Sequence, residues 1–81
     1  MSIVKGSIVK AKAGRDKDSF FVVLEVNQDF ALIADGKRRT IEHPKNKKLK
    51  HHEPTNTVIE GSFETNPQIR KILNEFTKNG G

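Results

Sequence analysis

The feature that most constrains the fold is the apolar run FFVVLEV at residues 20–26. Its aromatic and β-branched side chains favour a β-strand over a helix. A shorter apolar run at residues 7–12 precedes it, and a charged segment containing Gly14 separates the two. Gly14 suits a turn between strands because such turns usually need a residue at positive φ. The sequence therefore predicts two strands, at about residues 7–12 and 19–26, with Arg15 and Lys17 exposed on the turn that joins them.

Further short strands are predicted up to residue 52. Residues 27–29 predict a turn and residues 30–34 a third strand. Asp35 and Gly36 then predict a type I′ hairpin turn into a fourth strand at residues 37–42, in which Ile41 points inward and which ends before Pro44. Residues 45–48 are expected to form a loop and residues 49–52 a short fifth strand. Four or five short strands with tight turns predict a mainly β protein, a small closed barrel of the SH3-like type.

Strict alternation predicts which side of the second strand faces the core. Glu25 is expected to point outward, together with the side chains that share its face, Phe21 and Val23. The other face, with Phe20, Val22, Leu24 and Val26, is then expected to point inward. Phe21 is the one phenylalanine that this pattern leaves open to exposure, although packing in the core or at an edge is the favoured interpretation.

The last part of the chain predicts a helix. Asn66 and Pro67 suit the N-cap and the first helical position, and Gly80 or Gly81 can end the helix. Four apolar residues at helical spacing form one stripe: Ile69, Ile72, Leu73 and Phe76. A helix this short is marginal alone in water, so docking on the barrel is favoured over binding a partner protein. Residues 57–60 admit either a helical turn or an extended segment.

The chain is therefore expected to form one folding unit, with a barrel at residues 1–54 and a linker with a docked C-terminal helix at residues 55–81. Eighty-one residues suffice for a single domain. The sequence has no cysteine, which favours a reducing compartment. No apolar run approaches the roughly 20 residues that span a bilayer, so no membrane contact is expected. Both observations favour a cytoplasmic protein.

Part of the sequence resembles a known motif. Gly6 and Val9, followed by residues 13–17 (AGRDK) and 21–23 (FVV), look like a KOW motif, and residues 31–37 (ALIADGK) extend the match. Many KOW motifs have a second glycine where this chain has Asp18. Residues 6–54 as a whole resemble small KOW-domain RNA-binding proteins, which are similar to KOW-type large-subunit ribosomal proteins of archaea and eukaryotes. The resemblance implies an SH3-like barrel whose partner is ribosomal or other structured RNA, with ribosomal proteins as possible neighbours.

Positive charge is concentrated in one segment. The net charge is +5, and residues 37–52 contain seven Lys or Arg residues but a single acid, Glu42. Such asymmetry indicates a dedicated anionic partner. With the basic turn, it predicts phosphate contacts from twelve residues: Lys10, Lys12, Arg15, Lys17, Lys37, Arg38, Arg39, Lys45, Lys47, Lys48, Lys50 and His51.

RNA is a better fit than DNA, because no helix-turn-helix pattern that could read the major groove is present. The chain has no Trp or Tyr, and most of its Phe residues are expected in the core. Aromatic platforms are the usual means of binding single-stranded RNA. The sequence therefore predicts recognition of RNA shape through backbone phosphates, and it identifies no base-reading residue.

Other functions have less support. The three histidines and their neighbours Glu42 and Glu53 do not form four well-spaced zinc ligands, so neither a metal nor another cofactor is expected. The sequence has no cysteine nucleophile, no placeable pair of carboxylates and no phosphate-binding GxxxxGK loop. An enzyme is therefore not expected, and neither is a small-molecule substrate. The alternative is an SH3-like module that binds a peptide or protein in transcription or translation. Such modules usually use aromatic-lined grooves.

Overall fold

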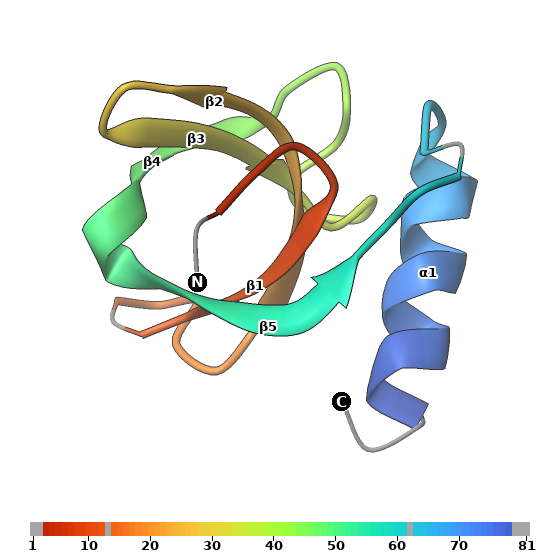
Figure 1. The fold of residues 1–81 in the computed structure, drawn as a ribbon. Helices are drawn as coiled ribbons and strands as arrows, with labels where there is room; N and C mark the ends of the chain where they lie inside the picture. The colour runs from red at the N-terminus through yellow and green to blue at the C-terminus, as the bar shows by residue number, and fades with distance from the viewer. Residues whose placement is uncertain (1–2, 13, 62, 79–81) are drawn as a thin grey trace.

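The computed structural model describes residues 3–12, 14–61 and 63–78. Five strands form one antiparallel sheet in the order β4-β3-β2-β1-β5, and a helix follows the last strand (Figure 1). The strands are β1 (Ser7–Ala11), β2 (Phe20–Asn27), β3 (Phe30–Ala34), β4 (Lys45–Lys48) and β5 (His52–Val58). A 3₁₀-helix, η1 (Leu49–His51), joins β4 to β5, and the α-helix α1 spans Asn66–Lys78. The predicted mainly β fold with a C-terminal helix is confirmed.

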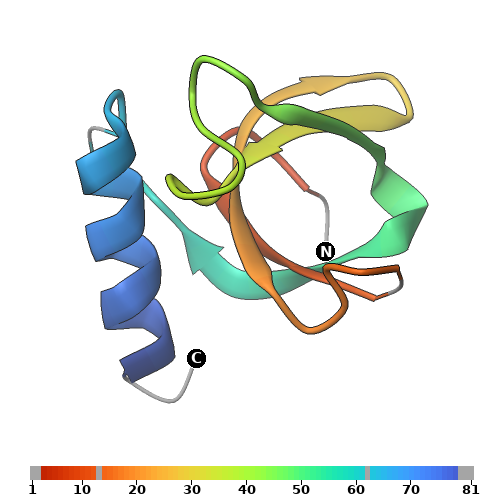
Figure 2. The same cartoon turned by 180° about the vertical axis from the view of Figure 1, so that it is seen from behind.

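The sheet is strongly curved but open. Seen from either side, it curls so far that its two edge strands approach each other, with η1 between them (Figures 1 and 2). In the described part of the chain, however, β4 pairs only with β3, and β5 pairs only with β1. The predicted closure of the barrel is therefore wrong. The unpaired edges carry residues that disfavour pairing with another strand, namely the lysines of β4 and Pro54 of β5, which has no N–H to donate.

A β-bulge inverts the predicted faces of β2. The register between β2 and β3 shifts between Val23 and Glu25, so strict alternation fails at this point. Phe21 and Val23 are buried on the inner, concave face of the sheet, whereas Val22 packs on the outer face beneath α1. Glu25 points outward as predicted, but it does not share a face with Phe21. The favoured interpretation that Phe21 packs in the core is confirmed, because this side chain is only 1% exposed.

Two apolar clusters lie on opposite sides of the sheet. The inner cluster contains Val9, Ala11, Phe21, Val23, Ala31 and Ile33. The outer cluster joins Ile8, Val22 and Ala34 of the sheet to Ile69 and Leu73 of α1. Ile72 and Phe76 pack against this outer cluster, and the Phe76 ring meets the Phe20 ring edge-on at 5.2 Å between centroids. The predicted apolar stripe of the helix and its docking on the sheet are confirmed.

Helix α1 begins with a capping box, and the N-cap residue of this box lies one position before the predicted N-cap, Asn66. The Oγ1 atom of Thr65 accepts a hydrogen bond from the N–H of Gln68, and the Oε1 atom of Gln68 accepts one from the N–H of Thr65. Thr65 is thus the N-cap. The prediction of Asn66 in this role is wrong, because the side chain of Asn66 bonds to a loop instead. The predicted stop at Gly80 or Gly81 lies outside the described residues. The helices of the described part are too short or too polar to cross a membrane.

The predicted fourth strand is absent. Residues 37–43 form bends and turns, and Asp35 with Gly36 does not make a two-residue hairpin turn. The carboxylate of Asp35 accepts hydrogen bonds from the N–H groups of Lys37 and Arg39, at 2.9 and 3.0 Å. The N–H groups of Asp35 and Gly36 both donate to the carbonyl of Arg39. These local bonds satisfy the backbone groups that a strand would offer to its neighbour, so the chain forms a compact loop.

The segment after this loop also differs from expectation. Residues 45–48, predicted as a loop, form β4, and residues 49–51, predicted as part of a strand, form η1. Strand β5 begins at His52 and continues past Pro54 to Val58, so the expected boundary at residue 54 falls within a strand. Of the two forms considered for residues 57–60, the extended one is present.

Candidate nucleic-acid interface

The turn between β1 and β2 is held by its own backbone. The N–H of Lys17 donates to the carbonyl of Gly14 at 3.2 Å, and the N–H of Asp18 donates to that of Ala11 at 2.9 Å. Gly14 has a φ of +84°, which confirms the predicted role of this glycine, and Asp18 also lies at positive φ, +71°. Arg15 and Lys17 are both exposed on this turn. Residues 14–18 therefore present two positive charges on a hydrogen-bonded backbone.

An ion pair connects this turn to β4. The Nζ atom of Lys45 lies 3.3 Å from Oδ2 of Asp16, and the two side chains are only 27% and 16% exposed. Because the pair is shielded from water, its attraction is screened less than that of a surface pair. Lys45 therefore positions the turn rather than offering a free charge to a ligand.

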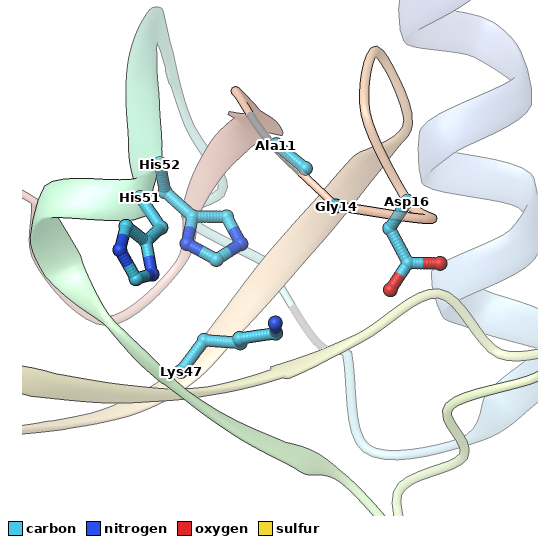
Figure 3. Close-up of a pocket in the computed structure, with 6 residues that line it drawn as sticks. All are labelled: Ala11, Gly14, Asp16, Lys47, His51 and His52. Carbon is cyan, nitrogen blue, oxygen red and sulfur yellow. The ribbon is translucent and has the colours of Figure 1, made fainter.

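A pocket of about 220 Å³ opens between the two edge strands, at the gap left by the open sheet (Figure 3). Six residues line it: Ala11, Gly14, Asp16, Lys47, His51 and His52. Lys47 lies opposite Ala31 in the β3–β4 register, so its side chain projects on the inner face of the sheet. Figure 3 shows its ammonium group reaching into the space between the histidine rings and Asp16. We call these six residues the seam pocket.

His52 forms an uncharged wall of the seam pocket at neutral pH. Its side chain is buried, and its ring packs edge-on against Phe21 with 6.3 Å between centroids. The Nδ1 atom lies 3.4 Å from the carbonyl oxygen of Lys48, to which it can donate in the Nδ1–H tautomer. Burial lowers the pKa of His52 below its ordinary value, and the nearby charge of Lys47 lowers this pKa further. The positive charge of the pocket therefore comes from Lys47.

The structure brings half of the predicted phosphate-binding residues to this seam. Lys47 and His51 line the pocket, Arg15 and Lys17 flank Asp16 on the turn, and Lys45 binds Asp16. The backbone N–H of Lys12 donates to the carbonyl of His51 at 3.0 Å, so Lys12 belongs to the same region. We define the seam group as Lys12, Arg15, Lys17, Lys45, Lys47 and His51.

The other predicted residues lie elsewhere. Lys48 and Lys50 line a separate pocket beside Phe30. Lys37, Arg38 and Arg39 belong to the β3–β4 loop, where Lys37 lines a groove shared with Arg70 of α1. Lys10 projects from β1, 3.6 Å from a carboxylate oxygen of Asp18 and 6.0 Å from the centre of the Phe20 ring. The basic residues thus occupy several surfaces around the sheet.

Most of these cations are free of carboxylate partners. Within residues 3–12, 14–61 and 63–78, ion pairs form at Lys10 and Lys45. Arg15, Lys17 and Lys47 therefore keep their charge available for an external anion. Across these same ranges, no group of three or more His, Cys, Asp or Glu side chains is placed to hold a metal ion.

Two residues that line these pockets, Phe30 and His52, were not predicted as site residues from the sequence. Phe30 is 37% exposed on β3, where the strand begins directly after the turn at Gln28 and Asp29. In the sequence, the only indication of this exposure is that Phe30 begins a predicted strand directly after polar residues. His52 lines the seam pocket together with His51 because η1 ends between the two residues. That arrangement depends on the 3₁₀ turn and has no signal in the residue types.

No protein-family model matches the chain, and the search of curated proteins found no matching sequence.

Proposed function

We propose that this protein binds structured RNA, ribosomal RNA or an RNA of similar complexity, through contacts with backbone phosphates. The observation that carries the proposal is the seam group. Two separate elements, the β1–β2 turn and β4, contribute its positive side chains to one region, and η1 places His51 beside them. Arg15, Lys17 and Lys47 in that group have no carboxylate partner in the described chain. Such an arrangement attracts a polyanion.

The chemistry of the seam group suits phosphate better than a small carboxylate ligand. Arginine can contact a phosphate through two parallel N–H bonds, and lysine provides a mobile point charge. The carboxylate of Asp16 is already paired with Lys45, so the unpaired cations that flank it, Arg15, Lys17 and Lys47, remain for a phosphate chain that passes along the rim of the pocket. We therefore propose a binding protein, rather than an enzyme, that follows an RNA backbone.

The sheet is open, but its five strands and strong curvature support a fold of the SH3-like kind that the KOW resemblance implies, and we propose that assignment as well. The strands are joined in sequence as an antiparallel meander with β1 and β5 side by side. The one α-helix of the described chain is docked on the sheet through Ile69 and Leu73. No second α-helix supports it in the described chain, as a supporting helix does in helix-turn-helix readers of the major groove, which favours an irregular, folded RNA. The location that suits this function is the cytoplasm.

The test is a charge reversal with a matched control. The variant Arg15→Glu/Lys17→Glu changes two exposed residues of the turn, and the control Lys5→Glu/Lys71→Glu changes two exposed residues outside the seam group. Both variants lower the net charge equally. Binding to ribosomal RNA fragments should weaken about 10-fold or more in the turn variant, because each lost phosphate contact is replaced by repulsion. The control should weaken binding much less.

Equal losses in the two variants would show that only net charge matters and would refute a role for the seam group. Failure of the unaltered protein to bind any structured RNA at low salt would refute the proposed function itself. Circular dichroism of both variants checks that the sheet and the helix are retained.

A further inference from the structure

We propose that a second site, centred on Phe30, receives an unpaired base of the bound RNA, an inference that rests on the proposed function. The pocket has a volume of about 490 Å³ and is lined by Asp29, Phe30, Lys48, Leu49 and Lys50. Its volume lies in the range of pockets that hold small organic ligands. It lies apart from the seam pocket and shares none of its lining residues.

The register of the sheet places an aromatic ring beside a cation. Phe30 of β3 and Lys48 of β4 are directly paired across the strands, so their side chains project side by side on the same face. This is the outer face, because the next residues, Ala31 and Lys47, project inward. Lys48 is exposed, and Phe30 is 37% exposed. A base stacked on the Phe30 ring would thus have its phosphate within reach of a lysine.

The walls of this pocket are fixed by backbone contacts. The N–H of Leu49 donates to the carbonyl of Asp29 at 2.8 Å, which ties η1 to the β2–β3 turn. Phe30 pairs with Asn27 on its other side, at the end of the hairpin. The ring is therefore carried by a strand held on both edges, and a stacking platform of this kind needs little reordering when a ligand binds.

The surrounding charges favour a nucleotide over a peptide. Lys48 and Lys50 contribute two positive charges to the lining, against the single carboxylate of Asp29. The pocket has one aromatic ring, whereas grooves that bind proline-rich peptides are lined by several. The carboxylate of Asp29 can accept a hydrogen bond from the amino group of a base, as acidic side chains do with cytosine. A single-stranded segment next to a helical RNA region offers the three groups that this pocket can contact: a base that can stack, its amino group and a phosphate.

The experiment compares three RNAs: a stable hairpin, the same hairpin with a short single-stranded 3′ extension of adenosines, and the same extension built from abasic ribose phosphates. The last two have equal charge and differ only in their bases. The unaltered protein should bind the adenosine extension about 5- to 150-fold more tightly than the abasic extension, the range expected for stacking of one base. Phe30→Leu should remove most of this preference, and Phe30→Trp should retain it.

Val58→Ala is the matched control, because Val58 is the other exposed apolar residue of the sheet, 48% exposed on β5. It should leave the preference for bases unchanged. A second measurement needs no variant: 2-aminopurine placed in the extension should change its fluorescence when its base stacks on Phe30. Absence of that change, together with equal affinity for the adenosine and abasic extensions, would overturn the proposal while leaving phosphate binding at the seam intact.

Retention of the base preference in a folded Phe30→Leu protein would also overturn the proposal, and the pocket would then be a candidate surface for a protein partner. If none of the three RNAs binds, the proposed function fails, and this inference fails with it.

Discussion

The Oδ1 atom of Asn66 accepts a hydrogen bond from the backbone N–H of Ile41 at 2.8 Å, across 25 residues of sequence. The Nδ2 atom of the same side chain donates to Oε1 of Glu42 at 2.9 Å. This second bond is the main reason that the pKa of Glu42 lies below its ordinary value. One amide group thus fastens the β3–β4 loop to the start of α1. The exposed Arg38 belongs to that loop, so its position depends on the helix.

Asn66→Ala should lower the free energy of unfolding by about 1–2 kcal/mol, because the N–H of Ile41 loses its acceptor in a partly buried position. Urea denaturation measures the change. Asn74→Ala is the control, since Asn74 is exposed on the same helix and alanine is the better helix former there. Its stability should stay the same or rise slightly. If Asn66→Ala were as stable as Asn74→Ala, the proposed role of Asn66 in holding the loop would be wrong.

Gly36 should tolerate alanine much less well than Gly14. Both residues have positive φ, +79° and +84°, so alanine has a backbone cost of about 1 kcal/mol at either position. A Cβ atom at Gly36 would also lie 2.6 Å from the carbonyl oxygen of Asn66 and 2.9 Å from Cγ of Arg70, whereas none of these contacts exists at Gly14. Gly36→Ala should therefore lose about 2 kcal/mol or more and Gly14→Ala about 1 kcal/mol. Thermal unfolding of the two proteins compares them directly, and equal losses would contradict this packing of the loop against α1.

Acidification should destabilise the protein through His52. Its pKa in the folded state is lowered from the ordinary value of 6.5, chiefly by burial, so the unfolded chain binds a proton more readily. The stabilising contribution is complete above that ordinary value and is lost as the pH falls below it. Urea denaturation at about pH 7.5 and pH 5.5 should show a smaller loss of stability for His52→Gln than for the unaltered protein.

His43→Gln serves as the control for this measurement, because His43 is exposed on the β3–β4 loop. It should show the same loss on acidification as the unaltered protein. An unchanged loss in His52→Gln would assign the pH dependence to other groups and contradict the argument from burial.

Binding of structured RNA should weaken steeply with salt. If about five phosphates are contacted, the logarithm of the association constant should fall with the logarithm of the salt concentration at a slope of about −3 to −5. Fluorescence anisotropy over a salt series measures this slope. Lys47→Gln, which removes the cation of the seam pocket without reversing it, should reduce the slope by about one. A slope near zero would contradict binding through phosphates.

The amino-acid sequence by itself determined the elements that depend on neighbours along the chain. The first two strands, the turn at Gly14, the third strand and the apolar stripe of α1 follow from local patterns, because each pattern places its side chains without reference to the rest of the fold. The same reasoning failed at Asp35, whose carboxylate bonds to its own loop in place of a hairpin turn. It failed again for Phe21, Val22 and Val23, because the bulge before Glu25 reverses the alternation that assigned the faces of β2.

Only the tertiary structure decided which cations lie close together and which aromatic ring is exposed. Lys47 meets Gly14 and His51 because the sheet curls until its unpaired edges approach, and Phe30 stands beside Lys48 because of the register between β3 and β4. Curvature and register are set by packing and hydrogen bonds between residues far apart in the sequence. Residue types alone therefore give the amount of positive charge in a chain, but not the surface on which that charge is gathered.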